Sequence, residues 1–269
     1  MKCFVLFLLV GNLFWVAYGA DNLRSPDMRS VGMGGNEVTQ APLFNPALIA
    51  FQPQKSIHLN YMNRYLLKEL GSFSGSCYLP NPWLSAGIDL SAFGYAEYKE
   101  LMIRLSVAKQ LGEHWSLGVA FHYSFLQTEL LEQLQGRVAT DVGILFKPLD
   151  NLLIGLLIMN IPAVIVGDKS MEIADFKYYL VQFGFHWLFM NNLSITGSLS
   201  VDERHKPMGS LGMEYTPFSS FFLRAGIQSS PILPSIGVGY RLQRFTIDTA
   251  AIYHRMLGMS MGIGLSYFF

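Results

Sequence analysis

A serine near the end of the chain has the spacing of a hydrolase nucleophile. The run Gly258-Met259-Ser260-Met261-Gly262 matches the Gly-x-Ser-x-Gly elbow, in which a serine attacks an acyl carbon. That elbow needs an acid and a histidine later in the chain, and neither type follows Ser260. His254 stands before the serine, across a predicted hairpin, as in outer-membrane phospholipases, but the alternation of this segment aims Ser260 away from lipid. We therefore expect no catalysis at this motif.

Two further chemistries are disfavoured by spacing. The stretch from Gly32 to Gly35 is rich in glycine but lacks the Gly-Lys-Ser/Thr ending with which a P-loop holds phosphates. The histidines fall on different predicted strands or turns, without the i, i+4 spacing of a helical metal site: His58, His114, His122, His186, His205 and His254. The sequence therefore predicts neither a metal centre nor any other cofactor.

Isolated ionisable residues on otherwise small-residue faces are the remaining candidates for a site. They are Arg104, His122, Asp141, His186, Glu214, Arg224, Arg241 and Asp248. Ionic groups removed from water need partners. One interpretation is a network of ion pairs that fixes another segment of the chain. The other is a ligand or cargo site that binds a carboxylate through Arg224 or Arg241, and the residues alone leave both open.

The composition limits the kind of protein that positions these groups. Charged residues make up only 14% of the 269 residues, against about 25% in ordinary soluble domains, and the mean hydropathy is +0.30. The 19 basic residues are balanced by 19 acidic ones, so no cationic excess is available for a nucleic-acid partner. Uninterrupted apolar runs are rare, which disfavours a helical membrane protein.

From about residue 55 onward, large apolar residues alternate with small ones. In the last segment, 257–269, the odd positions are mostly Leu, Met, Ile, Tyr and Phe, and the even ones are mostly Gly and Ser. A soluble β-sandwich also alternates, but its polar face usually carries Lys, Glu, Thr and Arg. A large, aromatic face opposite Gly, Ser and Ala is typical of strands that lie between lipid and a crowded lumen.

The alternation predicts fourteen strands, an even number as in single-chain bacterial barrels. Their ranges are 55–64, 71–79, 82–93, 96–110, 114–127, 136–147, 152–160, 176–188, 192–202, 207–215, 220–228, 234–242, 245–254 and 257–269. Short turns follow the even strands, and the long connections 65–70, 128–135 and 161–175 follow odd ones. This asymmetry predicts an all-β, transmembrane antiparallel barrel over 55–269 with periplasmic termini. The apolar run 161–166 is expected to form a sticky extracellular loop tip.

The residues before the barrel have two different patterns. Residues 1–20 begin with Lys2, continue as an apolar stretch and end in small residues, which indicates a signal peptide more than a retained anchor. Residues 21–54 lack alternation, and we interpret them as an N-terminal hatch or plug, with a disordered periplasmic tail as the alternative. Its candidate residues are Arg29, Gly34, Gly35, Asn45 and Pro46. Arg29 is expected to pair with inward acids such as Asp141, Glu214 and Asp248.

Several short motifs resemble those of a known family. Arg-Ser-x-Gly-Met-Gly-Gly at 29–35 followed by Asn-Pro-Ala at 45–47 resembles the N-terminal signature of the PorV/PorQ branch of the FadL-like (long-chain fatty-acid transporter) superfamily. The segments 147–160, 212–217, 223–226 and 257–269 look like its mid-barrel turn and C-terminal third. The resemblance implies a fourteen-stranded outer-membrane barrel with a hatch. Some members carry hydrophobic molecules, and others serve type IX secretion.

Two non-enzymatic functions follow from these patterns. The first is an outer-membrane barrel of a Gram-negative bacterium that handles or anchors cargo with secretion-machinery proteins, which should expose apolar loop tips. The second is a FadL-like transporter or channel for apolar small molecules, which should show a lateral gap or a path through the lumen. In both cases the expected partners include outer-membrane lipid and exclude nucleic acid.

Overall fold

The structure is a computed structural model that describes residues 26–128, 135–166, 179–202 and 207–269. The signal peptide predicted over 1–20 lies outside the described residues, as do most of the predicted loop 128–135 and the second part of the predicted loop 161–175. No helix in the described ranges is long and apolar enough to cross a membrane.

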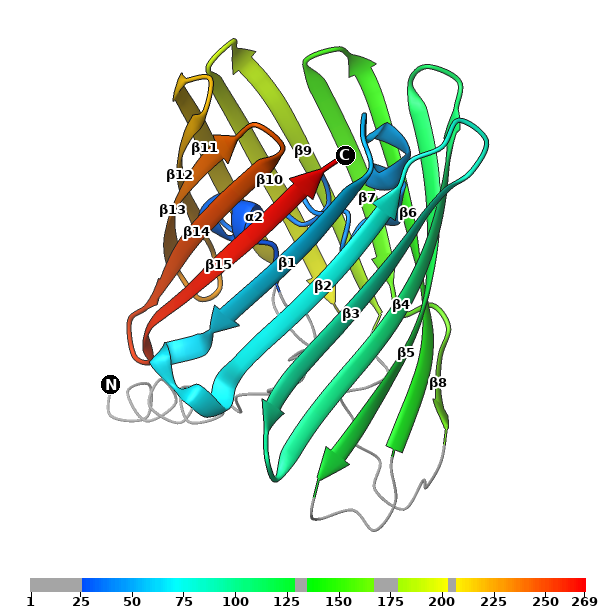
Figure 1. Ribbon diagram of the computed structural model, residues 1–269, viewed down its shortest axis with the longest axis vertical. Helices are drawn as coiled ribbons and strands as arrows, with labels where there is room; N and C mark the ends of the chain where they lie inside the picture. Colours follow the sequence, from blue (N-terminus) through cyan, green and yellow to red (C-terminus); the bar gives the residue numbers. More distant parts are fainter. Residues whose placement is uncertain (1–25, 129–134, 167–178, 203–206) are drawn as a thin grey trace, which may run out of the picture.

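One antiparallel sheet curls into a closed barrel (Figure 1). Within the described residues it has fifteen strands, of which fourteen form the ring and β8 pairs with β6 alone. The strands are β1 Ser56–Asn63, β2 Gly71–Leu79, β3 Ser85–Tyr95, β4 Tyr98–Leu111, β5 Trp115–Thr128, β6 Gln135–Leu149, β7 Leu152–Met159, β8 Ala163–Val166, β9 Leu180–Met190, β10 Leu193–Asp202, β11 Met208–Phe218, β12 Phe221–Gln228, β13 Leu233–Leu242, β14 Phe245–His254 and β15 Gly258–Phe268. The ring closes between β1 and β15, which pair from Ser56↔Phe268 to Asn63↔Met261.

The predicted fourteen-stranded barrel is confirmed, and one connection is wrong. The loop expected over 161–175 contains strand β8, whose residues pair with the first half of β6. The apolar run 161–166 is therefore largely part of the wall, where Val164 faces outward, and is not a loop tip. Strand β9 begins at Leu180, later than the predicted residue 176.

Strands β7 and β8 are two halves of one wall strand with a break between them. Strand β6 pairs with β7 at Val142–Leu149 and with β8 at Gly136–Ala139. Asn160 lies in the break with a φ of 64°, in the left-handed region that ends regular strand geometry. The ladder is carried across by backbone bonds in which the Ile161 N–H donates to the Thr140 oxygen (2.8 Å) and the Thr140 N–H donates to the Pro162 oxygen (3.3 Å).

The two faces of the wall have opposite character. Along β5, the odd residues from Trp115 to Phe125 lie on the outside, and the even residues from Ser116 to Ser124 are buried in the barrel. The same alternation runs through β15, where Met259, Met261 and Ile263 are exposed and Ser260 is buried. Because neighbouring strands of the ring pair with one another all the way round, the wall provides the backbone hydrogen bonds that crossing lipid requires.

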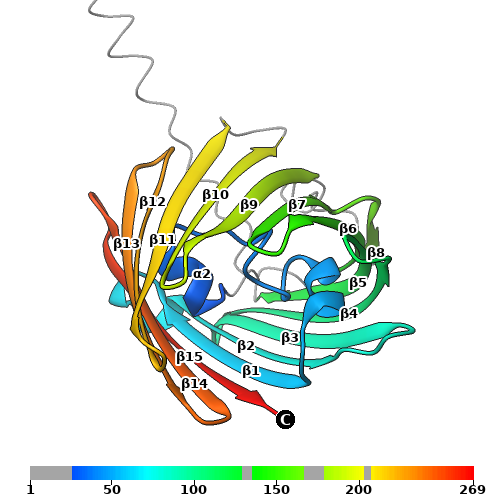
Figure 2. The ribbon, with the colours of Figure 1, turned by 90° about the horizontal axis from the view of Figure 1, so that it is seen from above.

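The described residues before β1, from Pro26 onward, lie largely inside the ring (Figure 2). Helix α2 (Met28–Gly32) contacts β12 to β15, and the 3₁₀-helix η1 (Pro46–Phe51) contacts β3 to β6. Two further 3₁₀ turns, η2 (Arg64–Leu66) and η3 (Lys68–Leu70), join β1 to β2. We call residues 26–54 the plug.

The buried apolar side chains of the described residues gather where the plug meets the wall. Met28 and Val31 of the plug pack with Met62 and Ala250, whereas Val38 packs in a separate cluster. Further clusters join Val38, Ala41, Leu43 and Phe44 to Leu157 and Met159, Ala47 and Leu48 to Leu145, and Ile49 to Tyr78 and Ala108. The hydrophobic core of this barrel is therefore its plug–wall interface.

A charge at the middle of an outward face should weaken the barrel. Phe121 lies midway along β5 with 55% of its surface exposed. We expect Phe121→Arg to cost about 2–4 kcal/mol of folding free energy in a bilayer, because an arginine at the membrane midplane loses its hydration. Denaturant unfolding in lipid vesicles measures this cost, with Phe121→Leu as the apolar control. Equal stability of the two variants would show that the faces are assigned wrongly.

Candidate functional site

The plug backbone approaches the wall so closely that only glycine fits at several wall positions. A Cβ added at Gly212 would overlap the Met33 carbonyl, and one at Gly226 would overlap the Gly34 nitrogen. Gly34 itself has a φ of +79°, and its Cβ would lie 2.8 Å from the Leu211 oxygen. The Gly34 N–H donates to Ser235 Oγ at 3.1 Å. The small inward residues of β11 and β12 therefore form the surface on which the plug backbone packs.

Two asparagines of the plug supply polar contacts that its irregular backbone lacks. The Asn36 side-chain amide donates to the Phe185 and Gly197 carbonyls of the wall, both at 3.1 Å, and its oxygen accepts from the Val38 N–H. Asn45 caps η1 by accepting from the Ala47 N–H, and it donates to the Val38 carbonyl at 2.8 Å. These bonds satisfy buried backbone groups that no strand ladder reaches.

Arg29 of α2 joins a group of three ionisable wall residues. We call the four residues the Glu214 cluster: Arg29, Glu214, Arg224 and Asp248. Arg29 Nη2 and Nε donate to the two oxygens of Glu214, at 2.8 and 3.1 Å. Arg224 Nε donates to Glu214 Oε2 at 2.6 Å, and its Nη1 donates to Asp248 Oδ1 at 2.5 Å. Two guanidinium groups thereby neutralise two carboxylates in a site where unpaired charge is costly.

A third carboxyl group, that of Asp27, caps α2 beside this cluster. Its Oδ2 accepts from the Ser30 N–H at 2.9 Å. Burial raises the pKa of Asp27 from 3.8 to about 6, against the lowering effect of the Ser30 N–H and of the two nearby arginines. The Glu214 carboxylate raises the pKa of Arg29 above its usual value, so Arg29 stays charged.

A second group, the Arg104 cluster (Arg104, His122, Asp141 and Asn160), joins the plug to the break in the wall. Arg104 pairs with Asp141 at 3.0 Å and donates to the Phe44 carbonyl of the plug at 2.6 Å and to the neighbouring Leu43 carbonyl. Asp141 Oδ1 accepts from the Asn160 N–H at 2.9 Å. His122 Nδ1 lies 3.9 Å from the other Asp141 oxygen. One buried carboxylate thus contacts both a plug-binding arginine and the β7–β8 break.

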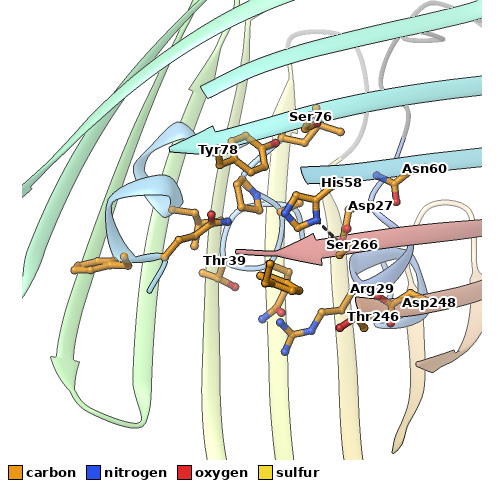
Figure 3. Close-up of a pocket in the computed structure, with 18 of the residues that line it drawn as sticks. Asp27, Arg29, Thr39, His58, Asn60, Ser76, Tyr78, Thr246, Asp248 and Ser266 are labelled. Carbon is orange, nitrogen blue, oxygen red and sulfur yellow. Dashed lines mark hydrogen bonds between the residues drawn. The ribbon is translucent and has the colours of Figure 1, made fainter. Parts of the chain in front are cut away.

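A cavity of about 340 Å³ lies on one side of the plug (Figure 3). Asp27, Arg29 and Thr39 of the plug line it, together with wall residues near the short-turn end of the barrel. His58 points into it, and its Nδ1 shares a 2.8 Å hydrogen bond with Ser266 Oγ. Apolar side chains complete the lining, among them Leu43, Leu48, Phe51, Leu153, Phe222 and Phe268.

A second cavity, of about 250 Å³, lies on the other side of the plug. Pro26, Val31 and Glu37 line it, with Arg64 and Gln228 from the long-loop end. Asp27 and Arg29 face the first cavity while their neighbours Pro26 and Val31 face the second. The plug is therefore a partition that divides the lumen.

The remaining sequence-selected residues lie in different places. His186 faces the plug, where Gln40 Nε2 donates to its Nδ1 at 2.6 Å, and Arg241 lines the first cavity. Gly35 has a φ of +81°, and Pro46 is the first residue of η1.

The residues of the nucleophile-like motif make only structural contacts in the described chain. Ser260 Oγ accepts from the Tyr65 N–H, and His254 Nδ1 accepts from two turn amides. Among the described residues, no three His, Cys, Asp or Glu side chains gather where they could hold a metal ion.

Sequence reasoning missed several interior residues. Asp89 is buried and accepts from the Tyr78 hydroxyl at 2.6 Å. Its position in the alternation of β3, between Ser85 and Ser91, was the available signal. Tyr78 breaks the rule that large residues face lipid, and Asn36 and Asn160 act through backbone contacts that carry no sequence signal.

Solved structures with the same fold are outer-membrane barrels. The chain superposes on the Pseudomonas putida toluene transporter TodX with a TM-score of 0.62 and 12% identity, over 92% of this chain and 99% of TodX. It matches a Pseudomonas aeruginosa FadL homologue with a TM-score of 0.60 and 12% identity, over 90% and 98%. The Acinetobacter baumannii outer-membrane protein Omp33 matches with a TM-score of 0.50 and 7% identity, over 80% and 98%.

No protein-family model matches the sequence, and no curated protein matches it either. At these low identities the likeness is one of fold. The chain thus shares a barrel fold with these outer-membrane proteins.

Loss of the shared carboxylate should loosen the plug. In Glu214→Gln the two arginines lose their common anion, and breaking a buried pair costs about 3–5 kcal/mol. We expect a cysteine introduced at buried Ser30, in a Cys77→Ser background, to react faster with an impermeant maleimide in Glu214→Gln than in the parent. Asp150→Asn, which removes an exposed turn ion pair with Lys147, is the control. Identical labelling rates in all three proteins would contradict this role for Glu214.

Proposed function

We propose that this protein is an outer-membrane channel of FadL-like type for small apolar molecules, with the plug as its gate. The partition supports this function, because the lumen holds a cavity on each side of residues 26–41 and the Arg29–Glu214 ion pair joins that segment to the wall.

The chemistry of the cavity lining supports an apolar cargo. Phe51, Leu153 and Phe222 lie at the first cavity alongside hydroxyl and charged groups. TodX is a toluene transporter, and its superposition covers nearly all of both chains. For this protein we propose the same general class of cargo, with export through a signal peptide and residence in the outer membrane of a Gram-negative bacterium.

Deleting the plug should open the lumen. Fourteen strands enclose more space than side chains fill in an eight-stranded barrel, and the inward residues here are mostly small. We expect deletion of residues 26–50 to raise single-channel conductance in planar bilayers and to speed toluene entry into vesicles. Both proteins must first show heat-modifiable migration, the mark of a closed barrel. Equal, low conductance and flux in the folded deletion and the full chain would contradict the gate.

A second candidate is a barrel that handles or anchors secretion cargo, and apolar tips at the long-loop end favour it. Met256 is 88% exposed, Ile232 71% and Leu66 60%. Copurification of the tagged full chain from native membranes tests this function, with a Leu66→Ser, Ile232→Ser, Met256→Ser triple variant as the control. A secretion protein recovered with the parent and lost with the variant is the expected result. The same recovery with both would argue against docking at these tips.

A further inference from the structure

A row of polar side chains crosses the wall of the first cavity. Strand register places them side by side on the lumen face: Arg241 opposite Thr246, Thr246 opposite Ser266, Ser266 opposite His58, and His58 opposite Ser76. All five line the cavity. We call Arg241, Thr246, Ser266, His58 and Ser76 the lumen row.

Arg241 differs from the other arginines of this cavity. Arg29 and Arg224 are bound to Glu214 and Asp248. Within the described part of the chain, Arg241 makes no ion pair, and its Cζ lies 5.1 Å from the centre of the Phe222 ring. Stacking on an aromatic face holds a guanidinium in place while leaving its edge N–H groups free to bind an anion.

Thr246, the neighbour of Arg241 in the row, has an unused hydrogen-bonding group. Its side chain is 6% exposed, and its Oγ1 has no hydrogen-bond partner among the described residues. Buried hydroxyl groups normally have partners. An unpartnered hydroxyl beside an unpaired guanidinium is suited to a ligand that brings an anionic oxygen.

The cavity also has apolar lining residues. Leu43, Leu48 and Phe51 come from the plug, and Phe222 and Phe268 come from the wall. Its volume of about 340 Å³ lies at the small end of the range for ligand pockets. The cavity therefore suits a compact ligand with a flat apolar body and one polar end.

We propose that this cavity binds small aromatic carboxylates, with the carboxylate on Arg241 and Thr246 and the ring against the apolar plug residues Leu43, Leu48 and Phe51. Of the three carboxyl groups in this lining, Glu214 and Asp248 are paired with Arg29 and Arg224, and Asp27 accepts the Ser30 N–H. As a substrate class for transport, small aromatic carboxylates depend on the channel function proposed above.

Calorimetric titration of the purified full chain in detergent tests the site with benzoate, toluene and sulfate as probes. We expect benzoate to bind the parent at least about tenfold more tightly than Arg241→Gln, because one charge-assisted contact is lost. Thr246→Val should weaken benzoate by a smaller factor, and toluene should not distinguish the variants. Arg244→Gln, at an exposed position outside the cavity, is the matched control and should bind benzoate as the parent does.

Three results would overturn the proposal: no benzoate binding to the parent, equal benzoate affinity in the parent and Arg241→Gln, or sulfate binding as tight as benzoate, which would indicate a general anion site. Failure of the channel itself is seen separately, in vesicle flux. Benzoate binding that depends on Arg241, without flux through the plug-deleted barrel, would keep the site and reject the channel.

Discussion

The width of a fourteen-stranded ring is the constraint from which the rest of this structure follows. A barrel of this size encloses a space that inward side chains cannot fill, and here those side chains are mostly Gly, Ser and Ala. The outer face must be apolar because it meets lipid, so the wall has no second apolar face with which to form a core. The plug, residues 26–54, occupies part of this space and supplies the apolar partner that the inner face lacks. The buried apolar clusters of the described chain all join the plug to the wall.

Small inward residues and interior charged residues both contribute to the contact between the plug and the wall. Glycines at 212 and 226 let the Met33–Gly34 backbone lie directly on the strands, a contact that any Cβ would prevent. Arg29 and Arg104 connect plug and wall in opposite directions. Arg29 extends from the plug to Glu214 of the wall, and Arg104 extends from the wall to carbonyls of the plug. Apolar packing places the plug against the wall, and these two arginines add polar contacts between them. Each arginine also contacts a carboxylate, Glu214 or Asp141, that has more than one partner.

Much of the wall could be predicted from the sequence, because lipid imposes a strict period of two on every strand. The alternation of 114–127 and 257–269 predicted which residues face outward, and the same rule predicted the inward position of Arg224 and Asp248. The break at Asn160 was not predictable, since it depends on an amide that donates to Asp141, nineteen residues away. Nor were the roles of Arg224 and Arg241 separable, because both lie over the Phe222 ring and only the fold shows that Arg224 is also bound to two acids. Asn36 likewise acts on carbonyls that are distant in sequence.

In the proposed channel, Arg29 and Glu214 together hold the partition closed. A double-mutant cycle with Arg29→Gln, Glu214→Gln and the double variant tests it most directly, with the free energy of plug docking taken from channel open probability in planar bilayers. We expect the effects of the two substitutions on the free energy of plug docking to be non-additive, with a coupling energy of about 0.5–3 kcal/mol. The double variant should open little more than Glu214→Gln alone. Additive effects of the two substitutions would contradict it.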